Sequence, residues 1–320
     1  MTAALTIGIT TRNRPQSLAA CLVSLAVVAD LDPEVLVFDD GSSPAADAGI
    51  ARGVLPVQPR FIRDESAPGY ITGRNRLVRE ASAPCVLLLD DDARLMSAAS
   101  VLDALRVLRS DPRVAAVALA QAEVDGRPWP AAMQPSHASI PSLVPTFIGF
   151  AHMIRRDVFL EHGGYREAFE FYGEEKDFGL RLLEAGYHTV YLPGALVVHA
   201  IDPAGRDSRR HLRFVARNDC LMALYNDPFF RLLWMLPARY ALYFRMRRAW
   251  KVNDPWGWAW LAGNLLRRLP GVWRERKPVS RATLATWAAL RRNEVPYTFA
   301  DPPPAHAHAA DIHVFTREPR

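Results

Sequence analysis

Over its first 200 residues the chain alternates short apolar runs with amphipathic stretches, and this limits its fold more than any other feature. Continuous apolar runs are typical of strands that are buried on both faces of a sheet. We expect such strands at 5–10, 35–38, 60–63, 86–89 and 114–120, and helices at 15–29, 70–81 and 98–109. Alternation of this kind predicts an α/β fold with a mostly parallel central sheet flanked by helices.

The pattern after residue 120 is less regular. Five prolines between 126 and 146 predict a long functional loop. We then expect a strand at 146–154, a short helix from Arg156, a helix at 175–185, and short strands at 189–192 and 195–198.

Charge divides the chain into two unlike parts. Residues 1–204 carry 18 Lys and Arg against 25 Asp and Glu, whereas residues 205–320 carry 21 against 9. Seven of the eight tryptophans lie beyond residue 230. We therefore predict a first domain over 1–204 and a basic helical extension over 205–320.

The extension shows helical periodicity at 211–226 and 229–250, with Pro237 interrupting the second stretch. Its longest charge-free run in that stretch, 232–238, is far shorter than the ~20 residues that a spanning helix needs. Arginines mixed with Trp, Tyr and Phe fit an interfacial helix better, or else a subdomain that packs on the first domain. The proline-rich tail after about residue 294 is expected to be poorly ordered.

The cysteines and the N-terminus bear on location. Cys21, Cys85 and Cys220 lie far apart in apolar stretches, as buried thiols of a reducing compartment do. No basic segment followed by an apolar core opens the chain, so we expect a cytoplasmic protein.

Acidic residues follow two of the predicted strands. Asp90-Asp91-Asp92 come after an apolar run, and ligands bind outside the carboxyl ends of parallel strands. Asp90 and Asp92 could share one Mg²⁺ or Mn²⁺ that keeps positions open for phosphate oxygens, with His199 as a nitrogen ligand at another strand end. The alternatives are a solvated acidic turn and a structural histidine.

The second acidic pair, Asp39-Asp40, could accept hydrogen bonds from a ribose hydroxyl or a base N–H, or could cap a helix. Arg74 and Asn75 follow Gly69 and could bind diphosphate or ribose at the rim of the site, although an exposed helical arginine is usually only solvated.

A third acidic cluster, Glu174, Glu175 and Asp177, opens a predicted helix after Gly173. Acids there interact favourably with the helix dipole. Alternatively, one of them is the general base of a glycosyl transfer with inversion, which takes the proton of the acceptor hydroxyl.

Taken together, these elements resemble the family 2 glycosyltransferases of GT-A fold over about residues 4–200. The matching motifs, in family order, are Ile9–Pro15, Phe38–Ser43, Gly69 with Arg74-Asn75, Leu89–Asp92, Ile154–Arg156 before Gly163–Tyr165, Gly173–Phe178 with Arg181, and Tyr191–Pro193 leading to Val198-His199.

The resemblance implies that the first domain has a nucleotide-sugar half at about 1–95 and an acceptor half at about 96–204, and it implies a role for each matching position. Thr10 and Arg12, with Asp39 or Asp40, would hold the nucleoside of a nucleotide-sugar. Asp90 and Asp92 would be the DxD pair, with Asp92 the direct metal ligand and His199 completing the site. Glu175 would be the base, with Glu174 or Asp177 as alternates, and Gly149–His152 resembles a strand that lines the acceptor site. The family often has an acid where this chain has Arg166, which weakens any acceptor contact there.

The extension resembles that of bacterial members that build surface polysaccharides, whose acceptors are often lipid-linked sugars at the cytoplasmic face. We therefore predict an inverting, metal-dependent hexosyl- or deoxyhexosyltransferase of the cell envelope. Residues about 211–275 would contact the inner face of the plasma membrane, and no nucleic acid would bind. The alternatives are a sugar-phosphate nucleotidyltransferase and a non-catalytic nucleotide-sugar-binding scaffold.

Overall fold

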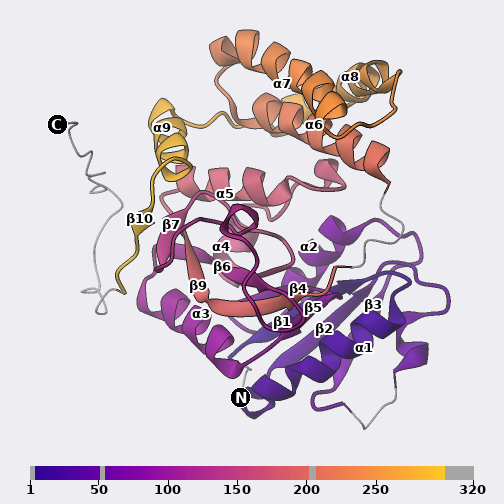
Figure 1. The fold of residues 1–320 in the computed structure, drawn as a ribbon, viewed down its shortest axis with the longest axis vertical. Coiled ribbons are helices and arrows are strands. Elements are labelled where there is room, and N and C mark those ends of the chain that lie inside the picture. The colour runs from indigo at the N-terminus through magenta and orange to yellow at the C-terminus, as the bar shows by residue number, and fades with distance from the viewer. Residues whose placement is uncertain (1–3, 51–54, 202–206, 300–320) are drawn as a thin grey trace.

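A computed structural model describes residues 4–50, 55–201 and 207–299 (Figure 1). Its first part is a parallel sheet in which β1 lies between β2 and β4, and β2 pairs with β3. These strands are β1 (Thr6–Thr11), β2 (Glu34–Asp39), β3 (Pro59–Arg63) and β4 (Cys85–Asp90). Their carboxyl ends therefore meet at one edge of the sheet.

The sheet continues with a change of direction. The strand β8 (Ala151–Arg155) runs antiparallel between β4 and β6 (Val114–Ala122), and β6 pairs parallel with β9 (His188–His199). Two short strands extend this end, β7 (Ser142–Val144) and β10 (Val295–Pro296), while β5 (Ala93–Leu95) pairs with β9. The sheet is mixed but mostly parallel in its first half, as predicted.

Both faces of the sheet are covered, which explains the uninterrupted apolar runs. In β4, Val86 and Leu88 join one core cluster, while Cys85, Leu87 and Leu89 join the other. The helices α2 (Tyr70–Glu80), α4 (Arg156–Glu161) and α5 (Glu174–Glu184) pack into the first cluster, and α1 (Pro15–Ser24) and α3 (Ala98–Ser110) into the second.

The C-terminal helices share the first of these cores rather than forming one of their own. Leu212, Tyr225 and Tyr243 belong to the same cluster as Phe169 and Phe178 of the sheet domain. Of the four helices, α6 lies against α5, and α7 and α8 pack on α6 (Figure 1). Their bounds are α6 (Ser208–Asn226), α7 (Phe229–Ala249), α8 (Gly257–Glu275) and α9 (Arg281–Leu290).

Several predicted elements differ in detail. The helix expected at 15–29 ends at Ser24 and continues as a 3₁₀ segment, η1 (Leu25–Leu31). The strands expected at 189–192 and 195–198 form the single strand β9, which has an irregular register against Leu119 and Ala120. The loop at 126–146 contains η3 (Ala131–Met133) and β7. Two further 3₁₀ segments are η2 (Ala46–Gly49) and η4 (Glu167–Phe169).

The prediction that Pro237 interrupts its helical stretch is wrong: α7 runs unbroken through this position, although the proline removes one N–H donor and its ring crowds the carbonyl four residues earlier. Val295 and Pro296, expected in a poorly ordered tail, pair with Leu143 and Ser142 of β7. The rest of that tail, 300–320, lies outside the described residues. None of the helices in the described ranges combines the length and apolarity needed to cross a bilayer.

Candidate active site

The two acidic motifs lie side by side at the carboxyl edge of the sheet. Thr11 of β1 pairs with Asp39 of β2, and Thr10 pairs with Asp90 of β4. Parallel pairing thus brings the segments around residues 10, 40 and 90 together, at the edge where open α/β sheets bind ligands.

In the Asp39-Asp40 pair the two carboxylates have different surroundings. Asp39 accepts hydrogen bonds from the main-chain N–H groups of Ser42 (2.8 Å) and Ala46 (3.0 Å) and from Arg63 (2.7 Å). Burial would raise the pKa of Asp39, but these hydrogen bonds lower it. Asp39 therefore holds the following loop in place, although the N-cap residue of the next helical segment, η2, is Ala45 and not Asp39.

Asp40 faces the glycine that begins α2. Its Oδ1 accepts from the N–H of Gly69 at 2.8 Å, and its Oδ2 lies 3.6 Å from the half-exposed Arg12 guanidinium. Burial raises the pKa of Asp40. Of the predicted nucleoside contacts, Arg12 alone is exposed, whereas Thr10, Asp39 and Asp40 are buried.

Arg14, which was not predicted as a site residue, binds the Asp90-Asp91-Asp92 segment. Its Nη1 lies 3.1 Å from Asp91 and 3.2 Å from Asp92, and Thr11 also donates to Asp91 at 2.8 Å. An arginine three residues after a strand and directly before a helix was the available signal. Arg14 partly balances a cluster of carboxylates that would otherwise repel one another.

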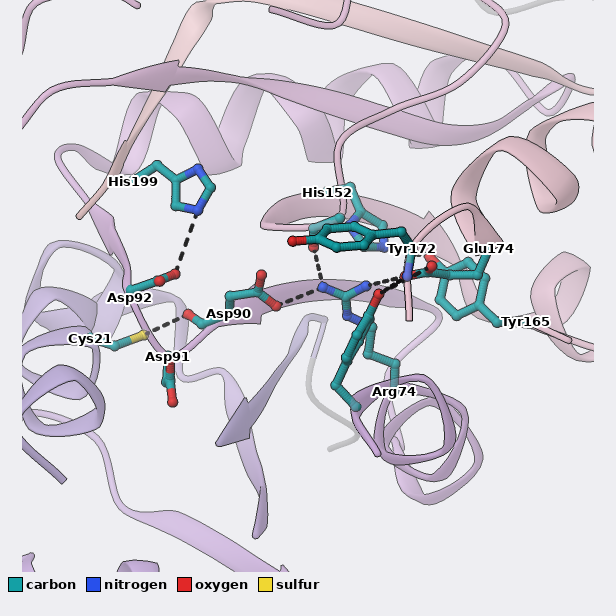
Figure 2. A network of polar contacts seen from close by, with 12 residues as sticks. Cys21, Arg74, Asp90, Asp91, Asp92, His152, Tyr165, Tyr172, Glu174 and His199 are labelled. Atoms are coloured by element: carbon teal, nitrogen blue, oxygen red, sulfur yellow. Dashed lines mark hydrogen bonds and ion pairs between the residues drawn. The ribbon is translucent and has the colours of Figure 1, made fainter. Parts of the chain in front are cut away.

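The anionic form of Asp92 is disfavoured by its surroundings. Burial, and then the neighbouring carboxylates of Asp90 and Asp91, raise the pKa of Asp92 to about 7. Its Oδ1 finds no hydrogen-bond donor in the part of the chain that the structure describes, and lies 3.6 Å from His199 Nε2 (Figure 2). A buried carboxylate in a negative environment, facing an imidazole, is suited to a cation.

The ring of His199 is held on three sides. Its Nδ1 lies 2.6 Å from Gln121 Oε1, and Gln121 in turn donates its amide N–H to the carbonyl of Met133. Phe150 and Trp129 stack on its two faces, with centroid distances of 4.5 and 5.6 Å. Because the Gln121 amide presents its oxygen, Nδ1 carries the hydrogen and Nε2 points towards Asp92.

These residues fit a divalent ion only in part. Asp92 and His199 converge, but the Asp90 carboxylate instead bonds to Arg74 at 2.6 Å. Within the described residues no three His, Cys, Asp or Glu side chains come together as a metal site. Asp92 and His199 are therefore the pair that could hold Mg²⁺ or Mn²⁺, with the other positions left for diphosphate and water oxygens.

Arg74 links this edge to the third acidic cluster. Buried beneath Tyr70, it donates to Asp90, to the carbonyl of Gly149 (2.7 Å) and to Glu174 (2.9 Å), as Figure 2 shows. The sequence predicts Arg74 and Asn75 at the rim of the site, but both side chains of α2 are buried. The Asn75 amide bonds to the main chain of Tyr165.

The three acids of α5 differ sharply in their contacts. Glu174 is buried and bonded to Arg74 and Tyr70, and burial followed by repulsion from Glu175 raises its pKa. Asp177 is also buried, and the paired donors Arg181, Arg166 and Asn226 lower its pKa despite that burial.

Glu175 is the half-buried acid of the three. A Cβ at Gly149 would lie 2.4 Å from Glu175 Oε1, so its carboxylate lies against the backbone of Gly149, beside Arg74. No hydrogen bond or ion pair occupies Glu175 within the described ranges. His152, on the strand predicted to line the acceptor site, is buried and bonded to Tyr165 instead.

Two family models match this chain. The glycosyl transferase family 2 model covers residues 6–163, and the glycosyl transferase family group 2 model covers residues 85–262, more than half of the chain. The chain belongs to glycosyl transferase family 2. The first range includes the acidic segments around residues 40 and 90, and the second includes the acids of α5.

Solved structures with the same fold include glycosyltransferases of this type. A mannosyltransferase from Pyrobaculum calidifontis, in complex with GDP-Man and Mn²⁺, is 16% identical over 91% of this chain and 85% of that chain, with a TM-score of 0.56. Residues 1–349 of S. aureus TarS, in complex with UDP-GlcNAc, are 15% identical over 91% of this chain and 87% of that chain, with a TM-score of 0.57. At this identity they establish the GT-A fold of this family 2 member.

A curated relative matches a short segment. An N-acetylglucosaminyl-diphospho-decaprenol L-rhamnosyltransferase of Mycobacterium tuberculosis is 40% identical over 65 residues, which is 20% of this chain and 21% of the relative. The match thus spans about a fifth of the relative's own length.

Proposed function

We propose that this family 2 glycosyltransferase moves a sugar from a nucleotide-sugar to a hydroxyl of a lipid-linked or free glycan acceptor, with inversion, during cell-surface polysaccharide synthesis. One observation carries the proposal: Arg74 bonds to both Asp90 and Glu174, so the acidic sheet edge and the acids of α5 belong to one site. Neighbours of the same fold bind GDP-Man or UDP-GlcNAc, and the short-segment relative is named for a lipid-linked acceptor.

On this proposal the donor lies along the sheet edge. Arg12 and Asp40, with Thr10 and Asp39 behind them, face the nucleoside. Asp92 and His199 would hold Mg²⁺ or Mn²⁺, which when bound offsets the negative charge of the departing diphosphate. Arg74 stays bonded to Asp90 and keeps that carboxylate orientated.

Glu175 acts on the acceptor. Its carboxylate takes the proton of the acceptor hydroxyl while that oxygen forms a bond to the anomeric carbon, and the bond from that carbon to the diphosphate oxygen breaks on the opposite face. Glu174 and Asp177 are less suited to this role, because each is fully buried and already bonded to arginine.

The decisive test is Glu175→Gln. We expect transfer to fall by about 10²–10⁴-fold, since a general base is removed, while the thermal shift produced by nucleoside diphosphate and Mn²⁺ persists. Glu184→Gln, at the far end of the same helix, is the matched control. Wild-type transfer by Glu175→Gln, or loss of transfer in a folded Asp177→Asn variant alone, would contradict the assignment.

We also propose that the extension touches the inner face of the plasma membrane through residues about 211–275. The support is chemical: α7 and α8 expose large apolar side chains next to arginines, a combination that favours the interface of an anionic bilayer. The exposed apolar residues are Phe229, Phe230, Leu233, Trp234, Phe244, Trp258, Leu266 and Trp273.

A further inference from the structure

The helices α7 and α8 both pack on α6 and leave an apolar groove of about 530 Å³ between them. Its lining comes from all three helices: Leu224, Leu236, Pro237, Tyr240, Ala241, Phe244, Ala262, Leu265, Leu266 and Leu269. The mechanism proposed above makes no use of this groove.

We propose that the groove binds the hydrocarbon chain of a polyprenyl-linked acceptor, an inference that rests on the proposed glycosyl transfer. The Tyr240 hydroxyl is the lone side-chain polar group of the lining, and it is occupied by the carbonyl of Trp258 at 2.5 Å. Binding sites for most metabolites place a few polar groups to orientate the ligand. A groove without them suits a ligand portion that has no polar atoms.

The edges of the groove favour a lipid that arrives from a membrane. On each helix an exposed apolar lining residue is followed directly by an exposed arginine: Phe244 by Arg245 on α7, and Leu266 by Arg267 on α8. Apolar side chains flanked by guanidinium groups complement a hydrocarbon chain that ends in phosphate.

The groove is also linked to the site. The helix α8, which contributes Leu265 and Leu269 to the lining, carries Arg268 between them, and Arg268 pairs with Glu170. Glu170 lies four residues before Glu174, and its carbonyl would be 3.8 Å from a Cβ at Gly69, the residue that binds Asp40. The helix that lines the groove is therefore bonded to the segment that leads to the acids of α5.

A second copy of the chain fits the groove less well. A symmetric dimer applies the same patch to itself. The surface that carries Arg245, Arg248, Arg267 and Arg274 would then meet an identical basic surface, and like charges across an interface are costly. The charge of this surface complements an anionic lipid instead.

The test measures binding rather than transfer, so it can fail or succeed independently of the proposed reaction. The probe is a long-chain polyprenyl phosphate in detergent micelles, titrated calorimetrically into the full chain. Ala241→Phe and Ala262→Phe fill the groove, and Ala238→Phe, exposed on α7 but outside the lining, is the matched control. We expect about tenfold weaker binding in the two groove variants, a loss of one decade in affinity, and wild-type binding in the control.

Three results would overturn the proposal. The first is wild-type affinity in both groove variants, and the second is equal affinity of the wild type for geranyl phosphate and the long-chain probe. The third is that the two groove variants, along with weaker binding of the probe, also sediment less with anionic vesicles that lack polyprenyl lipid. That result would assign the groove to bulk membrane lipid. Nucleoside diphosphate binding, followed by thermal shift, shows that each variant is folded.

Discussion

The imidazole of His199 shows how much of this site depends on residues outside the recognisable motifs. Gln121, Phe150 and Trp129 fix its ring, and they come from β6, from the residue before β8 and from the loop after β6, respectively. Residue types alone predict His199 and Asp92. They do not predict Gln121, because an isolated glutamine in an apolar strand has many possible roles.

Removing Gln121 should therefore weaken metal binding without touching the metal ligands. We expect Gln121→Ala to lower Mn²⁺ affinity about 10- to 100-fold, the usual cost of losing the partner of a ligating histidine. Electron paramagnetic resonance titration of free Mn²⁺ measures this effect. Gln58→Ala, a surface glutamine that bonds to Leu55, is the control. Equal Mn²⁺ affinities would show that Gln121 does not position His199.

Gly149 provides a second test at the same scale. A Cβ there would lie 2.4 Å from Glu175 Oε1 and 2.7 Å from Arg74 Nη1, so Gly149→Ala should displace the Glu175 carboxylate. Misplacing a reacting group by about 1 Å can cost ~10²-fold in rate, and we expect kcat to fall by about that factor while nucleotide binding is retained. Gly194→Ala, whose Cβ meets nothing within 4 Å, should behave as wild type in the same kinetic assay. If both alanine variants turn over alike, Gly149 does not hold Glu175.

At the scale of the elements, Asp177 joins α5 to its surroundings. It pairs with Arg166 and Arg181, which are both largely buried, and with Asn226 at the end of α6. Asp177→Ala leaves two buried guanidinium groups without their carboxylate, which should cost ~3–5 kcal/mol of unfolding free energy. Urea denaturation measures the loss, and Asp103→Ala, an exposed partner of Arg106, is the control. A loss of under about 1 kcal/mol, as for an exposed pair, would contradict this role.

The pH dependence of stability should change with Asp177. Its folded-state pKa lies below the ordinary value, so its contribution is present above the unfolded pKa of ~3.9 and is lost as the pH falls through the lower folded value. Denaturation curves of wild type and Asp177→Ala should therefore converge in strong acid. Curves that stay equally separated from neutral to strongly acidic pH would show that the charge of Asp177 is not what stabilises the fold.

The sequence predicts those elements that local residue patterns determine, and it misses those that depend on distant parts of the chain. The strands β1, β2 and β4 are confirmed within a residue or two, because burial on both faces leaves an unambiguous apolar run. The pairing of β10 with β7 was missed, because Val295 and Pro296 form only a two-residue strand, and that pairing is decided by distant chain segments. Arg74 is the clearest case: its position was found, but its inward direction depends on tertiary partners that no local pattern encodes.

On the scale of the whole molecule, the basic extension and the acidic sheet edge are parts of one packed body. Leu212 and Tyr243 belong to the core that also contains Phe178 of α5. The uneven charge distribution predicts that the two parts meet different partners. The structure adds that the two parts share one hydrophobic core. Composition alone could not establish this, because it does not say which apolar residues face one another.

Membrane contact can be tested on this body without truncating it. We expect Trp234→Ser with Trp273→Ser to reduce sedimentation with anionic vesicles several-fold, because both rings are more than half exposed, at 55% and 62%. Leu102→Ser, an exposed apolar residue of α3, should leave sedimentation unchanged. Equal sedimentation of the double variant and wild type would rule out these rings as anchors. Binding should also weaken as salt is raised, since the arginine contribution is screened.

The shared core has a practical consequence for anyone who exchanges acceptor regions between related enzymes. A chimaera joined near residue 205 would separate Arg217 from Phe169, and Asn226 from Asp177, so both fragments would meet foreign surfaces at once. Graft boundaries drawn around α7 and α8 instead, with α6 kept beside its native α5, would leave those contacts intact and exchange only the outer helices.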